Sequence, residues 1–297
     1  MSRCVLVIGG SGQLARALAR QPSIAGHPIR CLGRADLDAT DPAALEAALR
    51  AAGPLAIINA AAYTAVDKAE SDQAAAQALN AGLPGALAAH AAAHDLPLIH
   101  VSTDYVFDGT GTRPYREDDP IAPLGVYGAS KAEGERLVRH AGARHLILRT
   151  AWVWSEDGHN FVKTMLRLGR EREEVRVVAD QRGSPTYAGD LAAAIATLTA
   201  NALTAPAGLA WGTYHLTNRG ETTWHGFAAA IFAEAAAAGL KTPRLTAITT
   251  ADYPTPARRP AYSVLDTTAA ERRLGVAMPD WRISLATAFP KVLAAFP

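Results

Sequence analysis

The chain has 297 residues, of which 49% are hydrophobic, and its formal net charge is +1. This length suits one large α/β domain with an appended lobe, and the apolar content can supply a sizeable core. A charge near zero without a basic block argues against a nucleic-acid partner. No apolar stretch reaches the ~18 residues of a membrane span, so no membrane partner is expected.

Cysteine use and the N-terminal sequence indicate the compartment. The two cysteines, Cys4 and Cys31, fall in the first two predicted strands, where reduced packing residues are expected rather than a disulfide. Residues 1–8 lack the apolar region and cleavage site of a signal peptide. Cytoplasm is therefore the expected location.

A short apolar run at residues 3–8 predicts a buried parallel strand, and a glycine-rich turn follows it directly. The turn reads Gly-x-x-Gly-x-x-Ala and leads into an alanine-rich helix. Its glycines let the backbone approach a phosphate, and the helix N-terminus provides free N–H groups, so the pattern predicts a dinucleotide pyrophosphate site. The predicted contact residues are Gly9, Gly12, Gln13 and Leu14.

The second predicted strand, at residues 27–32, ends beside charges that could select the cofactor. A 2′-phosphate prefers an arginine at this place, and a 2′-hydroxyl prefers an acid. Arg34 lies where that contact belongs, and Asp36 and Asp38 lie nearby. The sequence therefore favours NADPH with NADH tolerated, and Arg34 and Asp38 are candidate cofactor contacts.

Alternation of predicted strands and helices continues through residue 152. Strands are expected at 55–59, 96–102 and 145–149, and helices at 42–52, 71–94 (broken near 82–84) and 126–140. Such alternation predicts a Rossmann-type α/β fold with a doubly wound parallel sheet, assigned to residues 1–152.

Beyond this point the pattern is mixed. Helices are expected at 160–172, 189–200 and 223–238, and a strand at 175–179. Residues 153–297 are therefore interpreted mostly as a smaller substrate-binding lobe, with 175–200 as the part that could return to the main sheet.

Two predicted strand ends carry side chains suited to a ligand, because ligands bind at the carboxyl edge of such sheets. Thr103 follows the strand at 96–102, and its hydroxyl can donate a hydrogen bond to a substrate carbonyl. A turn-capping threonine is the alternative. The other strand end has small residues that leave room for a flat cofactor ring or ribose. These candidates are Ala60, Ala61, Ala62 and Tyr63.

Tyr127 and Lys131 are the most informative pair in the sequence. They lie four residues apart, so a helix places both side chains on one face. An ammonium beside a phenol favours the phenolate, and the pair can pass a proton to a developing alkoxide. An isolated pair of this kind is more often a surface Tyr beside a solvated Lys. The glycine turn and strand ends described above favour the catalytic interpretation.

Together with the glycine turn, the segments 59–70, 102–109 and 127–131 resemble the extended short-chain dehydrogenase/reductases. A longer series of segments, spanning nearly the whole chain in order, resembles the dTDP-4-dehydrorhamnose reductase family within that superfamily. These further segments are 149–154, 160–165, 180–186 and 259–266. The last ones lie in the predicted substrate lobe, so they concern the substrate as well as the cofactor.

The resemblance implies reduction of the C4 keto group of dTDP-4-dehydro-L-rhamnose to dTDP-L-rhamnose, with hydride from NADPH. Tyr127 would give the proton, and Lys131 would lower the Tyr127 pKa and hold the nicotinamide ribose. Thr103 would orient the keto oxygen. Trp152 would face the sugar, with a packed core Trp as the alternative. The other implied substrate contacts are Asp104, Tyr105, Asn160, Gln181, Arg182 and Arg259.

One departure from the family concerns metal. Some members bind magnesium at a dimer interface through carboxylates that include one on the first helix, and residues 15–20 contain no acid here. No metal site is therefore expected, and a monomer or a homodimer remains open.

Two alternatives to the reductase stay open. Another nucleotide-sugar enzyme of the superfamily, such as a 4-epimerase or a talose-forming reductase, would share Tyr127 and Lys131. A non-catalytic NADP-binding regulatory subunit is the other, although it has no need of a tuned proton donor.

Overall fold

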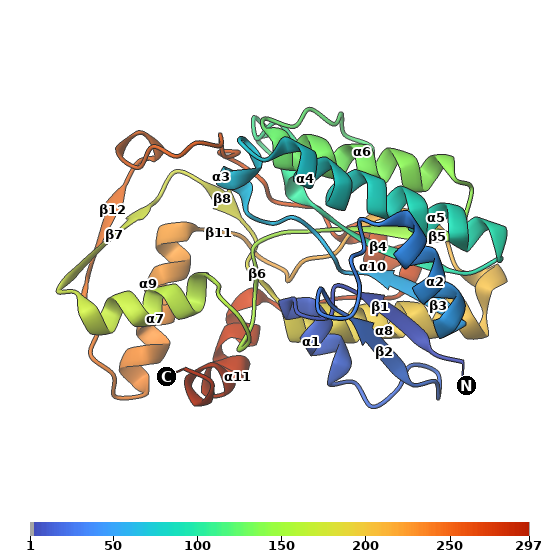
Figure 1. The fold of residues 1–297 in the computed structure, drawn as a ribbon. Coiled ribbons are helices and arrows are strands. Elements are labelled where there is room, and N and C mark those ends of the chain that lie inside the picture. The colour runs from blue at the N-terminus through green and yellow to red at the C-terminus, as the bar shows by residue number, and fades with distance from the viewer. Residues whose placement is uncertain (1–2, 297) are drawn as a thin grey trace.

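A six-stranded parallel sheet forms the centre of the larger lobe in the computed structural model, which describes residues 3–296 (Figure 1). The strand order is β10-β5-β4-β3-β1-β2, and every neighbouring pair is parallel. The order reverses between β1 and β3, which is where such sheets bind ligands. The strands are β1 Val5–Ile8, β2 Ile29–Leu32, β3 Ala56–Asn59, β4 Leu98–Thr103, β5 His145–Thr150 and β10 Gly212–His215.

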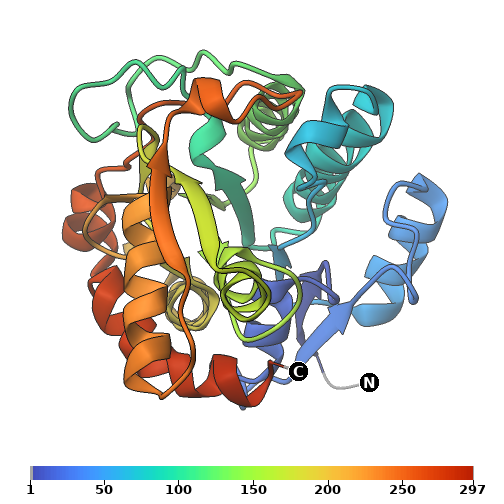
Figure 2. The ribbon, with the colours of Figure 1, turned by 90° about the vertical axis from the view of Figure 1, so that its left-hand side faces the viewer.

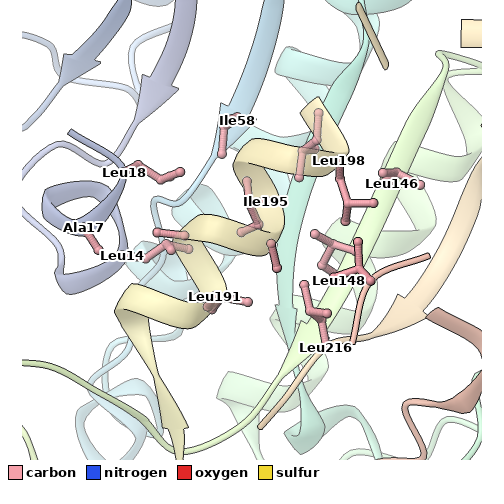
Figure 3. Close-up of a cluster of buried hydrophobic side chains, with 14 of the residues drawn as sticks. Leu14, Ala17, Leu18, Ile58, Leu146, Leu148, Leu191, Ile195, Leu198 and Leu216 are labelled. Carbon is pink, nitrogen blue, oxygen red and sulfur yellow. The ribbon is translucent and has the colours of Figure 1, made fainter. Parts of the chain in front are cut away.

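Both faces of this sheet are covered by helices, because its strands are apolar on both sides. On one face, α1 (Gln13–Ala19) and α8 (Ala188–Thr204) pack against β3 and β5, as the leucines and isoleucines of Figure 3 show. On the other face lie α2 (Pro42–Ala52), α5 (Leu83–Ala93) and α6 (Val126–His140). The predicted doubly wound α/β fold is confirmed.

The smaller lobe has its own core, which forms where its helices pack on one face of a two-stranded sheet (Figure 2). Its strands β7 (Glu174–Val178) and β12 (Arg244–Ile248) pair in parallel. Two further short pairs lie between the lobes: β6 with β9, and β8 with β11. The helices of the lobe are α7 Phe161–Glu171, α9 Trp224–Ala237 and α11 Trp281–Ala294. The four short strands are β6 Val153–Trp154, β8 Arg182–Gly183, β9 Thr186–Tyr187 and β11 Thr222–Thr223.

The range 175–200 divides between the two lobes. Its strand, β7, pairs with β12 and not with the large sheet, whereas its helix, α8, covers that sheet. The chain rejoins the large sheet one element later, at β10, which pairs with β5. Further along the chain, α10 (Thr268–Leu274) also packs into the core of the larger lobe. Downstream of residue 152 the chain thus crosses between the lobes more than once.

The predicted helix at 71–94 is interrupted by a π-helical turn. It consists of α4 (Gln73–Gln77), the π-helix η1 (Ala78–Gly82) and α5. Such turns occur frequently at functional sites. The remaining short elements are α3 Val66–Ala69 and the 3₁₀ turns η2 Asp104–Val106, η3 Pro206–Gly208 and η4 Thr250–Asp252.

Within residues 3–296, no helix is long and apolar enough to cross a membrane. Cys4 and Cys31 are both free thiols. Cys31 lies in β2, as predicted, whereas Cys4 directly precedes β1 and is not part of it.

Candidate active site

The glycine turn lies against the end of β3. Gly9 adopts a φ of +110°, and a Cβ atom there would stand 2.6 Å from the backbone nitrogen of Ala61. Only glycine allows this close approach. Gly12 has no side chain to cap α1, and the first turn of α1 contains no acid. The backbone N–H groups at the start of α1 are therefore free to bind a phosphate. The turn and the segment from Ala60 to Ala62 thus meet at the switch point of the sheet.

The next two residues of the turn have their side chains engaged elsewhere. Gln13 Oε1 accepts hydrogen bonds from Ser155 and Asn160, both at 3.0 Å. Leu14 is buried in the core beneath the sheet. Contact with a cofactor through these two residues would therefore use their backbone amides.

At the end of β2, the two acids Asp36 and Asp38 form hydrogen bonds within their own loop, whereas Arg34 does not. Asp36 Oδ2 accepts a hydrogen bond of 2.8 Å from the Gly33 amide. Asp38 Oδ1 accepts from both the amide and the hydroxyl of Thr40, and these bonds hold its pKa below the usual range. Arg34 is exposed and forms no ion pair within residues 3–296. It is the charged side chain best placed to meet a ligand here.

Tyr63 is fixed to the π-helical turn. Asn80, fully buried in η1, accepts from the Tyr63 amide at 2.8 Å and donates to the Tyr63 carbonyl at 3.2 Å. The side-chain amide of Asn80 also donates to Ser130 Oγ at 3.0 Å, and Ser130 in turn donates to the Tyr127 carbonyl. Asn80 therefore ties the predicted cofactor segment to the helix that carries Tyr127, a link that sequence reasoning missed.

Tyr127 and Lys131 lie on α6, as the spacing predicted. Lys131 is 2% exposed and donates to the carbonyl of Val101 on β4 at 2.5 Å. Burial lowers the pKa of Lys131 to about 8. Burial raises the pKa of Tyr127 to about 12, which the neighbouring Thr103 hydroxyl partly offsets. The expectation that Lys131 lowers the Tyr127 pKa is therefore not met, because desolvation of the phenol dominates.

A tyrosine with this raised pKa stays protonated at neutral pH. It can therefore give a proton, and it is poorly suited to take one.

Thr103, Asp104 and Tyr105 occupy the end of β4 and the turn η2. Thr103 Oγ1 donates to Asp104 at 3.0 Å and accepts from the Tyr105 amide at 3.2 Å, so it does cap the turn. Burial raises the pKa of Asp104 to about 6. The ring of Tyr105 meets that of Tyr127 edge to face, with centroids 5.5 Å apart. These three residues thus surround the Tyr127 hydroxyl side of α6.

Two carboxylates that the sequence did not single out fix the position of α6. Glu70 Oε1 accepts from the Val126 amide at 2.9 Å and so caps the helix one residue before Tyr127. Glu135, fully buried, binds Arg149 through two hydrogen bonds of 2.9 and 2.8 Å. Ser102 on β4 donates to the same carboxylate at 2.6 Å. The helix is therefore anchored to β4 and β5 by buried charge.

Trp152 leaves the carboxyl edge of β5 two residues after Thr150, whose strand partner is Thr103. Its backbone φ is +47°, which is unusual for a bulky residue. Its ring stacks on that of Trp224, with centroids 3.6 Å apart and planes 8° from parallel. It is half-buried, so both the packed and the ligand-facing interpretations describe part of it.

Three predicted substrate contacts are not brought to Tyr127 by hydrogen bonding. Asn160 caps α7 and binds Gln13 and the Ser155 carbonyl. Gln181 donates to Thr250 at 3.0 Å. Arg182 pairs with Glu221 at 2.7 Å near the surface. Their present partners are structural, and their predicted roles remain predictions.

Arg259 joins the two lobes. Its guanidinium forms a bidentate ion pair with Asp67 of α3, at 2.9 and 2.8 Å, and also binds Thr255. The arginine holds the pKa of Asp67 below its usual range. Arg259 thus stands next to Tyr105, whose pKa it lowers against the dominant effect of burial.

Within residues 3–296, no group of three or more His, Cys, Asp or Glu side chains is arranged to hold a metal ion.

The fold and this constellation at the carboxyl edge of the sheet define an extended short-chain dehydrogenase/reductase. The family model described as the RmlD substrate binding domain matches residues 2–293. Relatives that are 43–46% identical over 95% of this chain are named dTDP-4-dehydrorhamnose reductase, and the chain belongs to that family.

Relatives and solved structures agree with this assignment. A protein of Burkholderia thailandensis named dTDP-4-dehydrorhamnose reductase is 46% identical over 287 residues, covering 95% of this chain and 96% of its own length. An Escherichia coli protein of the same name is 43% identical over 289 residues, with 95% of each chain covered. The crystal structure of a Bacillus anthracis dTDP-4-dehydrorhamnose reductase in complex with NADP has a TM-score of 0.89 at 35% identity. It covers 98% of this chain and 100% of that one.

Proposed function

We propose that this protein reduces the C4 keto group of dTDP-4-dehydro-L-rhamnose with NADPH and forms dTDP-L-rhamnose. The observation that carries the proposal is the meeting of Thr103, Tyr127 and buried Lys131 at the sheet edge, in a chain of this family. The two lobes meet at the same edge through Trp152 and the Arg259–Asp67 ion pair.

The reduced nicotinamide supplies the hydride when bound. Tyr127 gives its proton to the oxygen that becomes the C4 hydroxyl, and its raised pKa keeps that proton available at neutral pH. The Thr103 hydroxyl, which neighbours that of Tyr127, can orient the keto oxygen if its proton turns from Asp104 to that oxygen. Lys131, charged below pH 8, adds a positive charge that stabilises the developing alkoxide and phenolate.

For the cofactor end, the support comes from Gly9, Gly12 and Arg34. The glycines present backbone to a pyrophosphate, and Arg34 at the end of β2 is exposed and has no ion pair among residues 3–296. We assign Arg34 to a 2′-phosphate and hence NADPH as the preferred cofactor, with NADH tolerated. A cytoplasmic location is proposed because both thiols are free, as expected in a reducing compartment.

The test is direct. Purified protein is incubated with dTDP-4-dehydro-L-rhamnose and NADPH, the loss of reduced nicotinamide is followed by absorbance, and the sugar product is identified. We expect dTDP-L-rhamnose as the product. A C4 epimer as the product would assign the protein to a talose-forming reductase, and binding of NADPH without turnover would indicate a regulatory subunit.

A further inference from the structure

Trp152 is held by contacts on several sides, and none of them is with the predicted catalytic residues. Trp224, the first residue of α9, covers one face of the ring at 3.6 Å. Phe161 of α7 packs against the ring of Trp224 with centroids 4.7 Å apart. The Trp152 ring therefore continues an aromatic layer that originates in the core of the smaller lobe.

Gly183 leaves the space that the ring occupies. A Cβ atom at Gly183 would lie 2.4 Å from a ring carbon of Trp152 and 2.7 Å from its indole nitrogen. Gly183 belongs to β8, which pairs with β11, and β11 leads directly into Trp224. One small sheet therefore positions both the glycine that admits the ring and the tryptophan that stacks on it.

The backbone of Trp152 needs such support. A φ of +47° costs free energy for any residue with a Cβ, and it persists only where the surroundings impose it. Trp152 O also accepts from the Thr186 amide at 3.2 Å, which fixes the peptide but not the ring. The face of Trp224 is the contact that fixes the ring plane.

We infer that Trp224 is a positioning residue for the sugar subsite. Its ring stacks on that of Trp152, supports the strained backbone conformation of Trp152, and so keeps the Trp152 ring beside the Thr103 end of β4. The inference rests on the proposed function, because it concerns where the dTDP-sugar is held. Trp224 acts through Trp152 and takes no part in proton transfer.

The experiment compares Trp224→Ala, Trp224→Phe and the control Trp211→Phe. Trp211 directly precedes β10, and its indole donates to the Pro206 carbonyl. It packs against the core of the larger lobe and is not part of the aromatic layer around Trp224. For each variant we measure the KM for dTDP-4-dehydro-L-rhamnose, the KM for NADPH and kcat. The circular dichroism couplet of two closely stacked indoles reports the ring pair itself.

For Trp224→Ala we expect loss of the couplet and a sugar KM raised about threefold to tenfold, which corresponds to the strength of an aromatic pair. The KM for NADPH should stay within about twofold. Trp224→Phe keeps a stacking ring and much of the volume, so it should lose the indole couplet and recover most of the sugar KM. Trp211→Phe should match the wild-type protein in all four measurements.

The results that would overturn the inference differ from the one that would overturn the proposed function. An unchanged sugar KM with a lost couplet overturns the inference, since Trp224 then only packs. A couplet that survives in Trp224→Ala also overturns it, because the stack is then not this pair. Equal loss in the sugar and NADPH KM values indicates general damage, and the inference fails. If Trp224→Ala does not fold, Trp224→Phe decides: a sugar KM raised beyond about tenfold contradicts rescue by stacking. A wild-type protein that does not reduce the sugar overturns the proposed function itself.

Discussion

The Tyr127 end and the Arg34 end of the candidate site are built in opposite ways. At the Tyr127 end, Lys131 and Arg149 are each 2% exposed and Glu135 is fully buried, and hydrogen bonds tie all three to the sheet. At the other end, Arg34 is exposed beside two acids that bind their own loop. Buried charge depends on every partner, whereas exposed charge is screened by water, so substitutions at the two ends should differ in size and in kind.

The largest expected effect is at the Tyr127 end. Tyr127→Phe keeps the ring and its contact with Tyr105 but removes the proton donor. Positioned proton transfer contributes typically ~10²–10⁴-fold, so we expect a loss of kcat in that range with little change in the KM for NADPH. Tyr253→Phe is the matched control, because Tyr253 is 62% exposed, and it should keep full activity. Unchanged turnover in Tyr127→Phe would contradict the assignment.

The buried ion pair behind α6 should affect stability more than any exposed pair. Glu135→Gln leaves Arg149 buried without its counter-charge, and breaking such a pair costs about 3–5 kcal/mol. The control is Glu133→Gln, two residues away, whose partner Arg136 is exposed, so about 0–1 kcal/mol is expected. Denaturant unfolding measures both.

The same pair gives a pH dependence. Burial opposes ionisation of Glu135, but Arg149 outweighs it and holds the pKa below the usual range. The pair therefore stabilises the fold above the unfolded pKa, ~4.3, and that contribution is lost as the pH falls through the lower folded pKa. Glu135→Gln should lack this part of the acid dependence. Equal stability loss in both variants at pH 7 would mean that burial is irrelevant here.

Titration of Lys131 should limit activity at alkaline pH. Because burial lowers its pKa to about 8, the ammonium loses its charge as the pH rises past that value. We expect kcat/KM to fall about tenfold per pH unit above it. In Lys131→Arg the cation keeps its charge, so the residual activity, although lower, should lack this decline. A wild-type plateau that extends to pH 10 would exclude a role for the charged lysine.

The smallest effect is expected at the exposed end. A charge-assisted hydrogen bond contributes ~1.5–3 kcal/mol, and exposure favours the lower figure, so Arg34→Ala should weaken NADPH binding about tenfold and leave NADH nearly unchanged. The NADPH preference of the wild type should shrink as salt rises. Arg30→Ala is the control, because Arg30 is an exposed arginine on β2, the strand that precedes Arg34. If both cofactors weaken equally, Arg34 supports the loop and does not read the phosphate.

The sequence predicted those parts of the site that are set within one element or one turn, and it did not predict contacts between distant elements. Tyr127 and Lys131 could be placed because a single helix sets their spacing, and the glycine turn because it follows an apolar strand directly. The pairing of Glu135 with Arg149 could not, because it joins a helix to a strand and both residues look like surface charges in the sequence. The stacking of Trp152 on Trp224 likewise depends on a contact between residues far apart in the chain.

Two strands, β10 and β7, differ from the sequence prediction, each for its own physical reason. β10 has only four residues, two of them half-buried, so no apolar run marks it. β7 has the apolar alternation of a strand, but alternation does not say which sheet receives it. The direction of the Tyr127 pKa shift was predicted wrongly. The spacing in the sequence indicates that Lys131 is near, but it gives no measure of how deeply the phenol is buried.

The repeated crossing of the chain between lobes bears on how the protein is synthesised. The edge strand beside β5 comes from residues 212–215, and α8 and α10, up to residue 274, cover one face of the large sheet. A nascent chain that has only reached the end of β5 exposes that apolar face and an open strand edge, both of which favour aggregation. We therefore expect the nucleotide-binding half to complete its folding only after most of the chain has left the ribosome, and chaperones to matter most in that interval.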